Sequence, residues 1–103
     1  MSNVTEMYVK EFNADLGELS LNLEGSKHWR RFNANRIEKI KKTTGIRKRL
    51  FTKKPVNRLE IFINGDEILY VIQEDKLKDD FEWVSDVIKK FAEKNKVEYE
   101  IAQ

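Results

Sequence analysis

The dipeptide Asn64-Gly65 lies between two alternating apolar runs, residues 59–63 and 68–72, and it constrains the fold more than any other feature. Asn-Gly favours a tight type I′ turn, because both central residues of that turn need a positive φ angle. The pattern therefore predicts an antiparallel β-hairpin. A two-residue loop and a four-residue loop over residues 64–67 are both compatible with the pattern. Either loop places the same side chains on the core face: Leu59, Ile61, Ile63, Ile68, Tyr70 and Ile72.

The opposite face of this hairpin is unusually apolar. It carries Phe62, Leu69 and Val71 beside Glu60 and Glu67. Exposed apolar patches often mark contact surfaces, so this face is expected to be covered by another segment of the chain or by a partner.

A helix is predicted from about Asp79 to Asn95, followed by a strand over residues 97–101. Apolar residues recur in the helix at a spacing that forms one stripe, which can pack on the hairpin. The stripe consists of Phe81, Val84, Val87, Ile88 and Phe91. Asp79 and Glu82 have the spacing of a capping box, and lysines gather in the last turns. The final residues alternate between apolar and polar side chains, which is typical of a strand.

The N-terminal half permits two interpretations. Residues 7–12 and 18–23 alternate and predict two strands, which can pair with each other. Residues 26–44 fit a helix that is capped by Ser26 and ends before Gly45, and we favour this interpretation. The alternative is a turn at Asn33-Ala34-Asn35 followed by a strand.

The predicted fold class is α+β, an antiparallel sheet with the amphipathic C-terminal helix packed on it. If residues 26–44 are helical, the order of elements resembles a ferredoxin-like fold. If they are strands, the chain is mostly β with one C-terminal helix and is similar in outline to bacterial PH-like domains. Neither analogy determines a function.

The length of 103 residues predicts a single globular domain over residues 1–103. The absence of cysteine excludes disulfides, thiolate zinc sites and cysteine nucleophiles. The first residues lack the features of a signal peptide, and no apolar run is long enough to cross a bilayer. We therefore expect a cytoplasmic protein that does not insert into membranes.

No residue pattern predicts catalysis, a cofactor or a metal site. His28 is the only histidine, and no partner carboxylate or nucleophile is positioned beside it by the sequence. The acidic residues in the segment from Glu74 to Asp80 lack the spacing of a calcium-binding loop, and two lysines lie among them. The phosphate-binding glycine motifs, the nucleophile elbow and the metalloprotease motif are absent. We therefore expect a protein that is not an enzyme.

Charge is distributed very unevenly along the chain. Residues 27–58 carry thirteen lysines and arginines against Glu38 alone, a net charge of +12, whereas the segments on either side are acidic. Cations interleaved with aromatic residues are the composition of a surface that contacts phosphates. The candidate anion-binding residues are Arg30, Arg31, Arg36, Arg47, Lys48, Arg49, Phe51, Lys53 and Lys54.

The conformation of the connector, residues 45–55, determines which of these side chains lie on the same side of the chain. If residues 46–52 form a strand with Leu50 packed inward, then Arg47, Arg49 and Phe51 share the opposite side. If Phe51 is the anchor instead, this row does not form.

The sequence therefore predicts a small non-enzymatic binding module for an anionic macromolecule. Nucleic acid is the leading partner, and an acidic protein surface is a further possibility. The alternative is a protein–protein adaptor or inhibitor, including a homodimer, that uses Phe62, Leu69 and Val71 on the outer face of the 58–73 hairpin.

Overall fold

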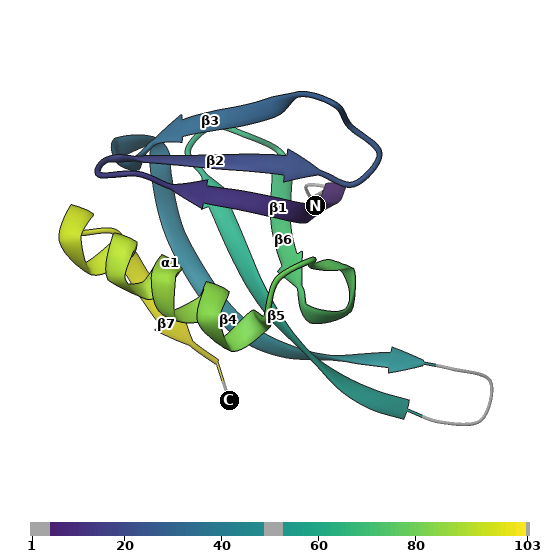
Figure 1. The fold of residues 1–103 in the computed structure, drawn as a ribbon. Coiled ribbons are helices and arrows are strands. Elements are labelled where there is room, and N and C mark those ends of the chain that lie inside the picture. The colour runs from purple at the N-terminus through teal and green to yellow at the C-terminus, as the bar shows by residue number, and fades with distance from the viewer. Residues whose placement is uncertain (1–4, 49–52, 103) are drawn as a thin grey trace.

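The computed structural model describes residues 5–48 and 53–102, and for residues 45–48, 53 and 54 it describes the backbone alone. A mixed β-sheet with one α-helix makes up these residues (Figure 1). The strands are β1 (Thr5–Ala14), β2 (Glu18–Leu23), β3 (Trp29–Asn33), β4 (Ile37–Lys48), β5 (Lys53–Ile63), β6 (Ile68–Gln73) and β7 (Glu98–Ile101). The helix is α1 (Phe81–Asn95), and the short 3-10 turns are η1 (Ala34–Arg36) and η2 (Glu74–Lys76).

The seven strands lie in the order β3-β2-β1-β6-β5-β4-β7. Neighbours are antiparallel except for the pairs β1–β6 and β4–β7, which are parallel. Strand β1 joins two halves of the sheet, because its first residues pair with β6 and the residues from Val9 onward pair with β2. A β-bulge between Val9 and Glu11 marks this change of partner. Bulges bend and twist a strand, so the sheet turns at this point.

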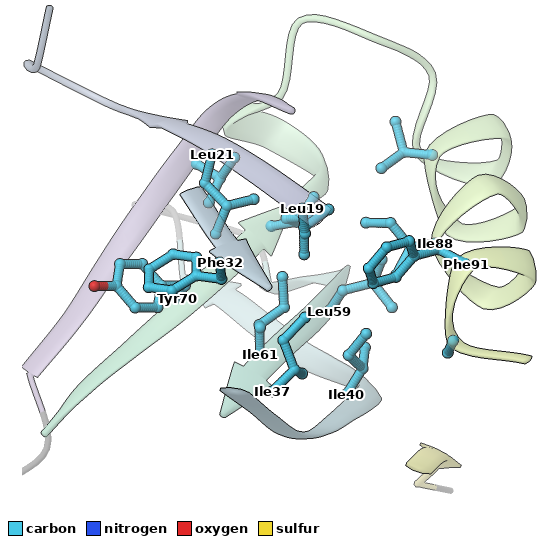
Figure 2. Close-up of a cluster of buried hydrophobic side chains, with 14 of the residues drawn as sticks. Leu19, Leu21, Phe32, Ile37, Ile40, Leu59, Ile61, Tyr70, Ile88 and Phe91 are labelled. Atoms are coloured by element: carbon cyan, nitrogen blue, oxygen red, sulfur yellow. The ribbon is translucent and has the colours of Figure 1, made fainter. Parts of the chain in front are cut away.

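The core lies between the two halves of the sheet and α1. Figure 2 shows Leu19, Leu59 and Ile88 meeting there from a strand of each half and from the helix, and all three are fully buried. The predicted helical stripe is confirmed, with Phe81, Val84, Ile88 and Phe91 buried and Val87 partly buried.

The β5–β6 hairpin confirms the predicted core face and decides between the two loops. Ile61 pairs with Tyr70 and Phe62 with Leu69, which is the register of the four-residue loop. Gly65 has a φ angle of 75°, but among the described residues Lys96 is the only non-glycine with positive φ. The type I′ turn predicted from Asn64 is therefore wrong. Instead, Asp66 ties the loop, because its backbone N–H donates to the Ile63 carbonyl and its carboxylate accepts from the Ile68 N–H.

Both ends of α1 are capped. The Asp80 carboxylate accepts a hydrogen bond from the Trp83 backbone N–H at 3.1 Å, so the N-cap lies one residue after the predicted Asp79. At the other end Lys96 has a φ angle of 57°, and the Val97 N–H donates to the Ala92 carbonyl at 2.9 Å. This geometry is a Schellman motif, which satisfies carbonyls that the last turn leaves without helical partners.

The helix that we favoured for residues 26–44 is wrong, because these residues form β3, η1 and the first part of β4. The turn lies at Ala34–Arg36, close to the position given by the strand interpretation. The ferredoxin-like order is therefore excluded. The observed α+β domain, with a seven-stranded mixed sheet and one C-terminal helix, agrees in part with the mostly β alternative.

Candidate nucleic-acid interface

The β4–β5 hairpin extends beyond the rest of the sheet as a two-stranded arm. Strand β6 pairs with β5 only over residues 58–62, and β7 pairs with β4 only over residues 39–42. Among the described residues, 43–48 of β4 and 53–57 of β5 therefore pair only with each other, and we call these residues the basic arm. Six residues of strand extend about 20 Å. Figure 1 shows the arm projecting from the body of the molecule at the lower right.

The base of the arm is held by polar contacts. The Thr44 hydroxyl lies 3.5 Å from the side-chain oxygen of Asn57 across the two strands. The Asn57 amide donates to the Glu74 carboxylate at 3.4 Å, which connects the arm to η2. These contacts anchor the arm to the body at the point where the sheet becomes two-stranded.

The arm does not neutralise its own charge. The backbone register pairs Arg47 with Lys54 and Lys48 with Lys53, and residues 43–57 contain no acidic residue. Like charges on directly opposite residues of an antiparallel pair are destabilising. A counter-charge must therefore come from outside the arm. The predicted site residues Arg49 and Phe51 lie outside the described residues. Leu50 lies outside them too, so the prediction that either Leu50 or Phe51 packs inward is not tested.

The β3 side of the molecule carries a second group of cations, Arg30, Arg31 and Arg36, and all three are exposed. The Arg30 guanidinium donates to the Tyr70 hydroxyl at 2.9 Å and lies 5.8 Å from the centre of its ring. The Arg36 guanidinium lies 5.9 Å from the centre of the Phe32 ring. Both guanidiniums therefore lie on aromatic rings and also remain accessible.

The contact between Arg30 and Tyr70 belongs to a short polar chain. The Tyr70 hydroxyl donates in turn to the Asp66 carboxylate at 3.2 Å. Burial raises the pKa of the Tyr70 phenol, and the hydrogen bond from Arg30 opposes that rise only in part. The phenol consequently keeps its proton near neutral pH and links β3 to the loop between β5 and β6.

The predicted cations do not gather on one face. In Figure 1, β3 lies across the body of the molecule from the end of the basic arm. The cations at the base of the arm are engaged within the chain: Arg58 lies 2.9 Å from Glu6 and 3.7 Å from Glu60. Lys39 lies 4.0 Å from Glu100. The positive charge of residues 27–58 therefore divides into the arm, the β3 side and a paired region between them.

The residues of the alternative interface are largely covered by this chain. Val71 is fully buried and Leu69 is 8% exposed, and in the parallel pairing of β1 with β6 their neighbours are Tyr8 and Glu6. Phe62 is partly buried, and the Lys39 ammonium lies 5.0 Å from the centre of its ring. The outer face of the β5–β6 hairpin is thus covered mainly by neighbouring side chains.

Sequence reasoning missed the polar outer face of β1, β2 and β3. Ser20 and Asn22 alternate with Leu19, Leu21 and Leu23 in β2, so they point away from the core. This alternation is visible in the sequence and indicates a polar strand face. Because a helix was predicted over residues 26–44, the prediction did not extend this polar face to Trp29 and Arg31 of β3.

Within the described ranges, no group of three His, Cys, Asp or Glu side chains is arranged to hold a metal ion. No helix in that part of the chain is both long enough and apolar enough to cross a membrane. Comparison with known protein families, with curated proteins and with solved structures found no match for this chain.

Proposed function

We propose that this protein is a non-enzymatic module that binds nucleic acid, with the basic arm as its main contact with phosphates. The observation that carries this proposal is a two-stranded ribbon that extends beyond its sheet and pairs cationic residues with cationic residues. A polyanion can supply counter-charge to these cations. Release of condensed counterions by such contacts provides the affinity, and it makes binding sensitive to salt.

The dimensions of the arm support a nucleic-acid partner. The major groove of B-form DNA is about 12 Å wide and admits a two-stranded β-ribbon. The arm extends about 20 Å from the sheet, which is enough to enter a groove or to follow a phosphate backbone. The arginines of β3 lie too far around the molecule to share one short contact with the arm, so they are assigned to a separate part of the nucleic acid.

The proposal is tested with mixed-sequence single- and double-stranded DNA and RNA at low salt. We expect micromolar or tighter binding that weakens steeply as salt is raised. A failure of every probe to bind in this range would refute the proposal, and so would affinity that is independent of salt.

Two charge-matched variants separate a specific arm from general positive charge. The arm variant carries Arg47→Gln, Lys48→Gln, Lys53→Gln and Lys54→Gln. The control variant removes the same charge from exposed positions at the end of α1 through Lys89→Gln, Lys90→Gln, Lys94→Gln and Lys96→Gln. If all four arm residues contact phosphates of duplex DNA, the slope of log K against log salt falls by about 3 to 4 in the arm variant. Equal losses in the two variants would rule out the arm as the contact surface.

The adaptor or homodimer alternative has less support, because Leu69 and Val71 are buried within the chain. It predicts self-association through Phe62 and its neighbours. Light scattering over a range of salt concentrations distinguishes the two proposals, since a strict monomer that binds nucleic acid fits only the first.

A further inference from the structure

The outer surface of β1, β2 and β3 carries two rows of side chains in register. The register places Asn13, Ser20 and Arg31 side by side in one row, and Glu11, Asn22 and Trp29 in the next. We call these six residues the outer polar face. Each row crosses three strands, so neighbouring side chains stand about 5 Å apart.

A hollow of about 200 Å³ opens on this face. It is lined by Asn13, Ser20, Trp29 and Arg31, which come from all three strands. Trp29 is 42% exposed, although it lies on a strand whose other face contributes Phe32 to the core. An exposed indole beside a hollow offers a flat platform on which another ring can stack.

Polar groups beneath this surface are buried to an unusual extent. Ser20 and Asn22 are each 9% exposed, and the Asn22 side-chain oxygen has no hydrogen-bond partner among the described residues. Buried acceptors in folded proteins are nearly always paired, so an unpaired one calls for an explanation. Asn22 lies directly across from Trp29 in the strand register, but its oxygen is buried beneath the surface, so the groups that this face offers to a ligand are Trp29 and Arg31.

The charges on the outer polar face favour a ligand that carries an anion. Arg31 is exposed and forms no ion pair with the described residues, so its charge is available. The one carboxylate of the face, Glu11, lies 3.1 Å from the Lys78 ammonium and is neutralised by it. A neutral sugar would stack on Trp29 but would leave Arg31 without a counter-charge.

We propose that the outer polar face binds an unpaired nucleotide of a single strand. Its base stacks on Trp29, and the adjoining phosphate contacts Arg31. This inference rests on the proposed function and makes it more specific, because a duplex keeps its bases stacked inside and cannot offer one to Trp29 without flipping it out.

The first test uses the intrinsic fluorescence of Trp29. The chain has two tryptophans, and Trp83→Phe leaves Trp29 as the only one. A mixed-sequence single strand of about 12 nucleotides, within the range that such sites cover, is titrated against this variant. We expect quenching by the single strand and none by a duplex of the same length or by an abasic strand. Equal quenching by the abasic strand would overturn the inference, because phosphate alone would then account for the signal.

The second test measures affinity by fluorescence anisotropy of a labelled strand in the wild-type background. Trp29→Ala is expected to weaken single-strand binding by roughly 5- to 100-fold, the usual range for loss of one stacked base. Trp29→Tyr is expected to restore most of the affinity, because tyrosine keeps an aromatic face, and this rescue separates stacking from a folding defect. Trp83→Ala is the matched control, since Trp83 is also exposed but lies on α1. Arg31→Gln is expected to lower the salt slope by about 0.7.

The results separate this inference from the proposed function. Binding that depends on the basic arm and is unaffected by Trp29→Ala overturns the inference and leaves the proposed function in place. Binding that depends on Trp29 and is unaffected by the arm variant supports the inference and excludes the basic arm as the main contact with phosphates. A complete absence of binding refutes both.

Discussion

Lys96 adopts a left-handed backbone conformation directly after α1, with a φ angle of 57°. This conformation costs an L-amino acid about 1–2 kcal/mol, whereas glycine adopts it without a steric penalty. Glycine also gains more conformational freedom in the unfolded chain and removes a cation that favours the helix C-terminus, and these effects oppose the gain. The net expectation for Lys96→Gly is therefore a stabilisation of about 0.5–1 kcal/mol.

The assay for this prediction is reversible thermal unfolding followed by circular dichroism. A chain of 103 residues unfolds with an entropy of about 0.2 kcal/mol/K, so the expected rise in Tm is about 2–5 °C. The matched control is Lys94→Gly, two residues earlier and also exposed, but inside the helix. There glycine is expected to lower stability by about 1 kcal/mol. If both variants lower Tm by the same amount, the Schellman geometry at Lys96 is wrong.

Three further substitutions test the core, the helix cap and a carboxylate on the sheet. Ile88→Ala is expected to cost about 2–5 kcal/mol in urea unfolding, since Ile88 is fully buried; a cost below 1 kcal/mol would contradict its place in the core. Asp80→Ala is expected to lower stability by about 1 kcal/mol in the same assay, whereas Asp79→Ala is nearly neutral, because only Asp80 caps α1. The hydrogen bond from Arg58 lowers the pKa of Glu6 below 4.5, so its stabilisation is complete above that pH and is lost as pH falls through the folded pKa. Glu6→Gln is therefore expected to have a lower Tm than wild type at neutral pH, and this difference is expected to vanish in acid. A difference in Tm that persists at pH 2 would exclude the titration of Glu6 as its source.

The parts of the fold that were predicted correctly have regular periodicity. In the β5–β6 hairpin, strict alternation identified the core face even though the turn type was wrong, because both loops preserve which residues point inward. In α1 the apolar stripe repeats at helical spacing, and the error at its start is one residue. Regular elements carry this information locally, so a single sequence is enough to recognise them.

The error over residues 26–44 has a physical cause in a β-bulge. Ile37 and Ile40 are both buried although they are three residues apart, a spacing that is typical of a helix. In the structure Ile37 pairs with Ile63 and Lys39 with Phe62, so Glu38 is the extra residue that shifts the alternation. A bulge depends on pairing with a distant strand, and no local pattern reveals it.

The candidate site was predictable in composition but not in layout. The sequence identified the cations, yet it did not show that Arg58 is paired with Glu6 or that β3 lies far from the arm. The outer polar face was also missed, because Trp29 and Arg31 join Ser20 only through strand pairing. Long-range register, which composition does not encode, brings these residues together.

The parallel pairing of β1 with β6 sets the order in which this chain can complete its structure during synthesis. Tyr8 emerges from the ribosome early, but its partner Val71 follows only after four more strands have been made. The β1–β3 meander can form from the first third of the chain, whereas its second edge stays open until β6 arrives. Until α1 is released, Leu19 of β2 lacks the helix side chains that it meets in the core. Contacts between such distant residues slow folding and prolong the exposure of apolar surface, so this small protein is expected to fold slowly for its size.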